Sequence, residues 1–191
     1  VLPLQRPCTM NTLCRTLLTL LFVLTSASLS SAQDAAGPEA WPMFRGTPTG
    51  SGRSSVILQL PLEEQWHRRF EGGAFTATPV INANTIYLGD LDGHFMALSL
   101  HDGKTLWQFD SPDSGFPSAA AVSTKTKYPF VVVGDDLGVI RCMNSNNGKV
   151  VWTLSMEGEI SGGPTILNVS EIPTVLIGSQ DATLINLLVT D

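Results

Sequence analysis

The apolar and polar positions of residues 76–188 alternate in short segments. Stretches of five to seven residues rich in Val, Ile, Leu and aromatic residues are separated by turns that contain Gly, Asp or Asn. This composition is typical of half-buried strands, and the 3.6-residue period of a helix is absent. The pattern predicts a short outer strand at 65–70, followed by strands at 76–81, 85–89, 94–100, 104–109, 118–123, 129–134, 139–144, 149–154, 162–167, 173–178 and 182–188.

One short phrase occurs twice and sets the period of the chain. A turn with Asp-Gly-Lys or Asn-Gly-Lys is followed by a strand that ends on Trp. Such turns favour tight hairpins because Gly adopts a positive φ at little cost. The spacing is 45 residues between the two copies, and an earlier Trp lies 41 residues before the first. The repeated positions are the turns Asp102, Gly103, Lys104 and Asn147, Gly148, Lys149, and the tryptophans Trp66, Trp107 and Trp152.

A period of 40–50 residues made only of strands and turns predicts β-propeller blades, each a four-stranded antiparallel sheet. Glycines end the second strand of each unit at Gly89, Gly134 and Gly178, and polar residues follow them. We expect these polar residues, Asp90, Asp135-Asp136 and Ser179-Gln180-Asp181, to keep the turns in water as structural or solvated groups.

Residues 65–191 form about three such units, and the last lacks its closing Gly-Lys…Trp strand. Three blades make an incomplete ring, because propellers typically have 4–8. We interpret the chain as an N-terminal fragment. A truncated reading frame or a part of an assembly are the alternatives.

Residues 1–32 have the pattern of a secretory signal peptide. Arg15 precedes an apolar run at 17–24, and Ser30-Ser31-Ala32 provides small residues for cleavage after Ala32. The run is too short for a spanning helix, which needs about 20 apolar residues. An uncleaved N-terminal anchor is the alternative. Met10 is an alternative start, because Pro3 and Pro7 make residues 1–9 a poor beginning for a leader.

Residues 33–64 are predicted to be a linker and an N-terminal docking segment. Polar residues 33–40 lead to Trp41-Pro42-Met43-Phe44-Arg45-Gly46, whose aromatic side chains need an apolar surface. Docking on the blades is therefore expected, with a ligand-binding aromatic arm as the alternative. We expect Arg45 to pair with a carboxylate or with carbonyl oxygens of the blade it covers.

Removal of the leader changes the charge and the cysteine content. Arg6 and Arg15 leave the 11 basic residues, so 9 remain against 17 acidic residues, a net charge of −8. Such an acidic chain is a poor partner for nucleic acid and for anionic membranes. Cys142 becomes the only cysteine of the mature chain, so no internal disulfide forms and the core alone stabilises the fold.

The repeat resembles that of the pyrroloquinoline-quinone (PQQ) or quinoprotein-like β-propellers. The resemblance rests on Met96-Ala97-Leu98 with Asp102-Gly103-Lys104-Thr105-Leu106-Trp107, on the looser copy that ends at Trp152, and on Trp41-Pro42-Met43-Phe44-Arg45-Gly46. It implies blades wedged together by tryptophans at the ends of outer strands, a role that Trp66, Trp107 and Trp152 match. The family includes quinone-dependent dehydrogenases and non-enzymatic periplasmic scaffolds.

The dehydrogenase members are characterised by a Ca²⁺ held by Glu, Asn and Asp, a catalytic Asp and, in many cases, adjacent cysteines. This chain has no Cys-Cys pair, and no loop offers the six to eight oxygens that Ca²⁺ takes. His67, His94 and His101 lack ligand spacing. We therefore predict no catalytic, cofactor-binding or metal-binding residues.

The sequence thus favours an exported, periplasmic or secreted repeat protein that acts in protein binding or complex assembly. Its expected partners are another protein or the remaining propeller blades, with no membrane span after cleavage. One alternative is a part of a PQQ-dependent alcohol or sugar dehydrogenase, which would bring PQQ and Ca²⁺ as cofactors. Another is an extracytoplasmic sensor propeller related to those associated with serine/threonine kinases.

Overall fold

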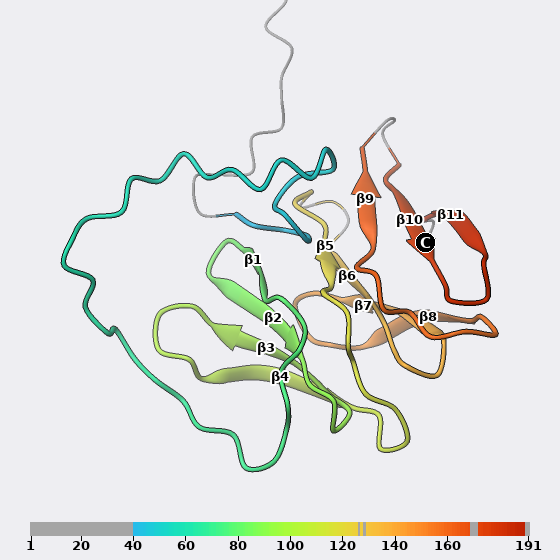
Figure 1. Ribbon diagram of the computed structural model, residues 1–191, viewed down its shortest axis with the longest axis horizontal. Coiled ribbons are helices and arrows are strands. Elements are labelled where there is room, and N and C mark those ends of the chain that lie inside the picture. The colour runs from blue at the N-terminus through green and yellow to red at the C-terminus, as the bar shows by residue number, and fades with distance from the viewer. Residues whose placement is uncertain (1–39, 126, 128, 169–171, 190–191) are drawn as a thin grey trace, which may run out of the picture. The chain divides into compact units, whose positions relative to one another are not determined.

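The computed structural model describes residues 40–125, 127, 129–168 and 172–189, all within one compact unit of residues 36–191 (Figure 1). The predicted signal peptide at 1–32 and its cleavage site lie outside the described residues. The described residues form eleven strands and no α-helix. Over these ranges, therefore, no helix is available that could span a membrane.

The first sheet, blade 1, is an antiparallel meander of four strands. They are β1 (Val80–Asn82), β2 (Thr85–Gly89), β3 (His94–Ser99) and β4 (Thr105–Asp110), and each pairs with the next. The turn before β4 shifts the register of the β3–β4 pair next to Ala97, a local irregularity that increases strand twist.

Blade 2 repeats this meander with β5 (Ala121–Val122), β6 (Phe130–Gly134), β7 (Val139–Asn144) and β8 (Val150–Ser155). Its last strand pair has the same register shift, at Cys142/Met143, which is the position equivalent to Ala97/Leu98 in blade 1. The two copies of the phrase therefore fold into the same structure.

Blade 3 has three described strands, β9 (Thr165–Leu167), β10 (Thr174–Gly178) and β11 (Leu184–Leu188), in the same order. The prediction of an all-β chain built from antiparallel propeller blades in an open arrangement is confirmed. The predicted strand at 65–70 is wrong, because no described strand pairs with this segment and a strand exists only within a sheet.

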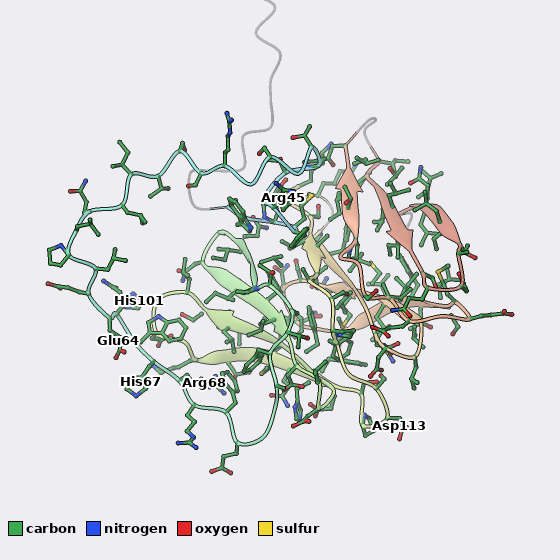
Figure 2. All side chains as sticks on the ribbon, in the orientation of Figure 1. Arg45, Glu64, His67, Arg68, His101 and Asp113 are labelled. Carbon is green, nitrogen blue, oxygen red and sulfur yellow. The ribbon has the colours of Figure 1, made fainter. Side chains whose placement is uncertain are left out.

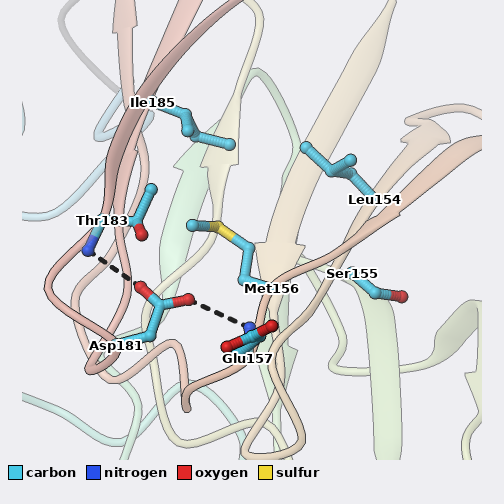
Figure 3. Close-up of a pocket in the computed structure, with 7 residues that line it drawn as sticks. All are labelled: Leu154, Ser155, Met156, Glu157, Asp181, Thr183 and Ile185. Carbon is cyan, nitrogen blue, oxygen red and sulfur yellow. Dashed lines mark hydrogen bonds between the residues drawn. The ribbon is translucent and has the colours of Figure 1, made fainter.

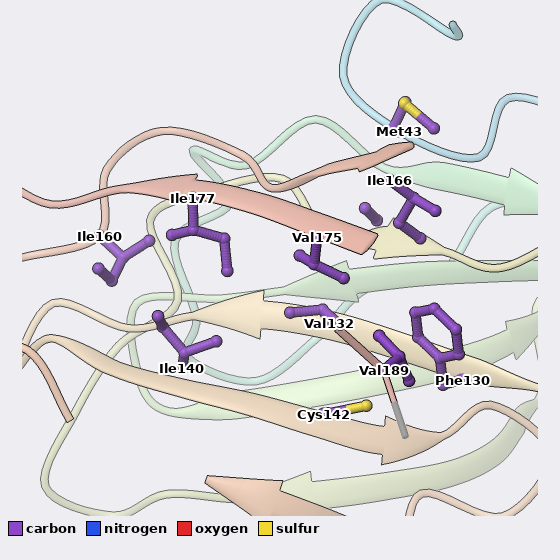
Figure 4. Close-up of a cluster of buried hydrophobic side chains, with 11 residues drawn as sticks. Met43, Phe130, Val132, Ile140, Cys142, Ile160, Ile166, Val175, Ile177 and Val189 are labelled. Carbon is purple, nitrogen blue, oxygen red and sulfur yellow. The ribbon is translucent and has the colours of Figure 1, made fainter. Parts of the chain in front are cut away.

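The core consists of two apolar layers, one on each side of blade 2. Val131 and Val133 of β6 face a cluster shared with blade 1, whereas Phe130 and Val132 face a cluster shared with blade 3 (Figure 4). All residues of β6 are buried for this reason. The two-residue period of the strand sends alternate side chains to opposite layers.

The N-terminal segment at 41–46 lies against the first strands of the blades. Trp41 exchanges two backbone hydrogen bonds with Ile81, at 2.7 and 2.8 Å, and the Val122 amide donates to the Pro42 carbonyl at 2.8 Å. Met43 is buried in the layer between blades 2 and 3. The expected pairing of Arg45 is wrong: its exposed guanidinium forms no hydrogen bond or ion pair with the described residues, and its side chain lies beside Gly50 and Gly52.

Candidate interaction surfaces between and beside the blades

The repeated tryptophan of blade 1 contacts the repeated turn of blade 2. Trp107, on β4, donates from Nε1 to the Ser145 carbonyl at 2.9 Å, and its ring lies directly over Gly148. A Cβ at Gly148 would be 2.5 Å from Trp107 Cε3, and its φ is +70°. Gly is thus required twice, by the turn and by the contact.

Trp66 repeats this geometry on the other side of blade 1. Its Nε1 donates to the Leu100 carbonyl at 3.0 Å, and a Cβ at Gly103 would lie 2.7 Å from its ring. Arg68 donates to the Gly103 carbonyl at 2.9 Å and to Thr105 Oγ1 at 2.8 Å. Residues 65–70 therefore occupy, against blade 1, the place that β4 occupies against blade 2, although no described strand pairs with them.

Trp152 is the equivalent residue of β8, and no described residue accepts a hydrogen bond from its Nε1. It is half-buried against the apolar layer between blades 2 and 3, and a pocket of about 270 Å³ lies between it and Leu187 and Leu188. The turn lysines differ from the tryptophans. Lys104 is exposed and pairs with Asp102 at 2.7 Å, and Lys149 is also exposed.

The turn residues shape the two β3–β4-type hairpins. Asn147 Oδ1 accepts a hydrogen bond from the Lys149 amide at 3.0 Å, as Asp102 Oδ1 does from the Lys104 amide at 3.4 Å. The hydrogen bond from Lys104 lowers the pKa of Asp102 to about 2. The roles of these residues as blade wedges and repeat turns remain predictions.

Asp90 and Asp135, the first acids after the second strands, are buried, so the expectation that they keep the turns in water is wrong for these two, whereas Asp136 is exposed. Asp90 is 2% exposed and Asp135 is fully buried. Asp90 Oδ1 accepts from the amides of Asp92 and His94, and Asp135 Oδ1 accepts from those of Leu137 and Val139. Each carboxylate thus satisfies backbone donors that the tight turn leaves unpaired.

Each of these buried acids has a cationic or ionisable partner. Asp90 Oδ2 lies 2.9 Å from Nδ1 of His94, and this hydrogen bond raises the pKa of His94. Asp135 Oδ2 accepts from Arg141 and from Ser114 Oγ at 2.7 Å. The Arg141 guanidinium also donates to Ser111 and lies 5.5 and 5.7 Å from the ring centres of Phe109 and Phe116.

Blade 3 lacks both members of this pair. The strand register aligns Ile185 with Arg141, and the turn bond from the Ser179 amide to Thr183 aligns Ser179 with Asp135. A pocket of about 400 Å³ is present at this position between blades 2 and 3 (Figure 3). Its lining residues are Leu154, Ser155, Met156, Glu157, Asp181, Thr183 and Ile185.

An exposed apolar arm, residues 56–62, precedes the Trp66 segment. Its five large aliphatic side chains are 53–81% exposed, and no described strand pairs with it. They are Val56, Ile57, Leu58, Leu60 and Leu62. Continuous apolar surface of this kind marks an interaction site in soluble proteins.

The described residues contain no group of three or more His, Cys, Asp or Glu side chains that could hold a metal ion. Glu64 is hydrogen-bonded to His67, and both residues belong to the segment that precedes blade 1, as does Arg68 (Figure 2). Cys142 is buried, and this burial raises the pKa of its thiol to about 12, so it is a core residue.

Sequence reasoning missed Arg141 and the pocket at Ile185. Arg141 stands in a strand where every neighbour except Asn144 is apolar, and such a lone charge in an otherwise buried strand indicates a buried partner. The acid six residues earlier in the same unit is that partner.

The comparisons with known proteins agree on the fold. The model of the family described as "Outer membrane protein assembly factor BamB" matches residues 62–136. The predicted resemblance to the PQQ-repeat β-propellers is thereby confirmed for this part of the chain. No curated protein matches the chain.

Three solved structures are similar. BamB from Moraxella catarrhalis has 24% identity and a TM-score of 0.53, over 65% of this chain and 36% of that protein. Two are quinohemoprotein alcohol dehydrogenases, ADHIIG from Pseudomonas putida HK5 and the enzyme from Comamonas testosteroni. Each has 19% identity to this chain and a TM-score of 0.60. They match over 74% and 78% of this chain, which spans 23% and 24% of their lengths.

Proposed function

We propose that this chain is an exported, non-catalytic repeat protein whose PQQ-type blades bind other polypeptides and support the assembly of a complex. The match of residues 62–136 to the model of an outer membrane protein assembly factor supports this class of function. The polypeptide bound is either a partner protein or further propeller blades.

The observation that carries the proposal is the exposed arm at 56–62. The arm is an extended run of large aliphatic side chains that no described strand covers. Burial of these side chains by a second polypeptide would favour binding, by about 25 cal/mol per Å² of apolar area. Apart from the Val56 amide, which donates to Ser54 Oγ, and Pro61, which has no amide, its backbone donors and acceptors are available to a neighbouring strand, the mode of binding called β-augmentation. The same stretch leads into Trp66, which fixes it beside blade 1.

The arm can be tested by site-specific photocrosslinking in the cells that produce the protein. A photoreactive residue at Leu58 should yield a discrete adduct with a protein, whereas the same residue at the exposed Asp113 should not. The absence of an adduct at Leu58, or an equal yield at Asp113, would overturn the proposal.

The alternative of a dehydrogenase is favoured by the fold shared with the two quinohemoprotein alcohol dehydrogenases. We propose instead that this chain binds neither PQQ nor Ca²⁺, because the buried carboxylates of Asp90 and Asp135 are already engaged in hydrogen bonds with backbone and side-chain groups. Purified protein mixed with PQQ and Ca²⁺ should show neither tight binding nor dye-linked alcohol oxidation. Stoichiometric binding at micromolar affinity would establish the alternative.

The proposed location is the periplasm or the exterior of the cell. It follows from the signal-peptide pattern at 1–32 and from the outer-membrane description of the matching family. The third alternative, an extracytoplasmic sensor propeller, requires the same export.

A further inference from the structure

The position of Ile185, between blades 2 and 3, has an equivalent between blades 1 and 2, and the side chain that fills that equivalent position is known. Between blades 1 and 2, the equivalent position carries Arg141, whose guanidinium donates hydrogen bonds to Asp135 of its own blade and to Ser111. The guanidinium also lies over Phe109 and Phe116. This cleft is therefore shaped for one arginine side chain, and the chain itself provides it.

Between blades 2 and 3 the cleft has the same framework without that arginine. Met156 takes the place of Ser111, as both amides donate to the equivalent turn glycine, Gly138 or Gly93. Leu154 takes the place of Phe109 by strand register. With Ile185 in place of Arg141, a pocket of about 400 Å³ remains. This is near the lower end of the ~300–1,000 Å³ of small-ligand sites, so it suits one long side chain.

The chemistry of the lining is apolar inside and anionic at the rim. Leu154, Met156 and Ile185 provide the apolar part, and the carboxylates of Glu157 and Asp181 lie beside it (Figure 3). Asp181 accepts from the amides of Thr183 and Glu157 at 2.8 and 3.0 Å. A carboxylate held in one orientation in this way keeps lone pairs for a further donor.

We propose that this pocket binds an arginine side chain presented by a partner polypeptide, with the guanidinium at Asp181 and Glu157 and the methylene stem between Leu154, Met156 and Ile185. An arginine combines the apolar stem and the planar, permanently charged donor group that the pocket complements. The inference rests on the proposed protein-binding function and adds the chemistry of the residue that is bound.

The test uses the full chain labelled with ¹⁵N and the probe Nα-acetyl-arginine amide, whose ends are uncharged. Titration should give saturable shifts of the Glu157 and Thr183 amide resonances. The isosteric neutral probe Nα-acetyl-citrulline amide should bind at least about fivefold more weakly, and so should the arginine probe to Asp181→Asn or Glu157→Gln protein. The matched control, Asp113→Asn, removes an exposed carboxylate outside the pocket and should leave the affinity unchanged.

A second variant fills the pocket from within. Ser179→Asp with Ile185→Arg restores the pair found in blade 2 and should abolish the shifts while the remaining spectrum stays native. No saturable shift with the arginine probe, or equal binding of citrulline, overturns the inference. Either result leaves the crosslink at Leu58 unaffected, so the failure of the pocket is distinguishable from failure of the proposed function.

Discussion

The indole of Trp107 lies over Gly148. The two residues belong to successive repeats, and each has its counterpart 45 positions away, Trp152 for Trp107 and Gly103 for Gly148. Trp107 lies within the outer strand of blade 1, β4, while Gly148 forms the turn before the outer strand of blade 2. The contact therefore joins two blades through the residues that define the repeat. The hydrogen bond from Trp107 Nε1 to the Ser145 carbonyl fixes the orientation of the ring.

Truncation of Trp107 should strongly destabilise the protein. The Trp107→Ala change removes aromatic contacts with Tyr87 and Phe95 and leaves the Ser145 carbonyl without this donor, so the free energy of unfolding should fall by about 3–5 kcal/mol. Urea unfolding followed by circular dichroism measures this loss. The exposed Lys104→Ala variant is the control, with a change under about 0.5 kcal/mol. Equal, small losses would place the tryptophan outside the interblade contact.

The Gly148→Ala substitution should also destabilise the protein, for two reasons. Its φ of +70° disfavours any side chain, and the new methyl group would overlap the Trp107 ring. We expect a loss above about 1 kcal/mol in the same unfolding assay. Gly162→Ala is the matched control, because no atom lies within 4 Å of the added methyl group. A Gly148→Ala loss no larger than that of Gly162→Ala would contradict the contact.

The leader prediction has a direct chemical test. The pattern of Arg15, the apolar run at 17–24 and Ala32 predicts that N-terminal sequencing of the exported protein begins at Gln33. A mature protein that retains Leu20 would contradict cleavage and would favour the uncleaved anchor.

The strands were predictable because the repeat shows each of them more than once. The stretches 85–89 and 139–144 were predicted with their observed bounds, since Gly and Asn-Gly turns mark their ends. The segment at 65–70 has the composition of a strand as well. It forms no strand in the described structure because pairing depends on a neighbouring chain segment, which local pattern does not reveal.

The burial of Asp90 and Asp135 was not predictable from composition. An acid after a turn glycine is usually solvated, but here the connection to the next blade folds over it, with the Phe116 and Ile160 amides donating to the carbonyls of Asp90 and Asp135. This covering is a long-range consequence of blade packing. The tryptophan positions were visible from the sequence, whereas the pocket at Ile185 depends on what Arg141 does in the neighbouring blade.

The His94–Asp90 pair should respond to pH. The hydrogen bond with Asp90, supported by the charges of Asp110 and Asp92, raises the pKa of His94 above the ordinary value of about 6.5. His94 therefore binds a proton more tightly in the folded state than in the unfolded state. The resulting stabilisation is fully present below pH ~6.5 and is lost as the pH rises through the folded-state pKa.

The Asp90→Asn variant keeps a side-chain oxygen that accepts hydrogen bonds from the Asp92 and His94 amides but removes the negative charge. It should therefore lower the pKa of His94. The pH dependence of the His94 ring-proton resonance measures this value in both proteins. Asp113→Asn is the control and should leave the pKa unchanged. An unaltered pKa in Asp90→Asn protein would show that the pair does not hold the proton.

The pair of Asp135 and Arg141 should behave as one unit. Arg141→Ile alone leaves a fully buried carboxylate without its cation, which should cost about 3–5 kcal/mol of unfolding free energy. The double change of Asp135→Ser with Arg141→Ile reproduces the residues of blade 3, Ser179 and Ile185, which fold without a buried charge. It should therefore lose less than Arg141→Ile alone, because no unpaired charge remains. Urea unfolding of the single and double variants gives the coupling energy, and strictly additive losses would mean that the carboxylate tolerates the absence of Arg141.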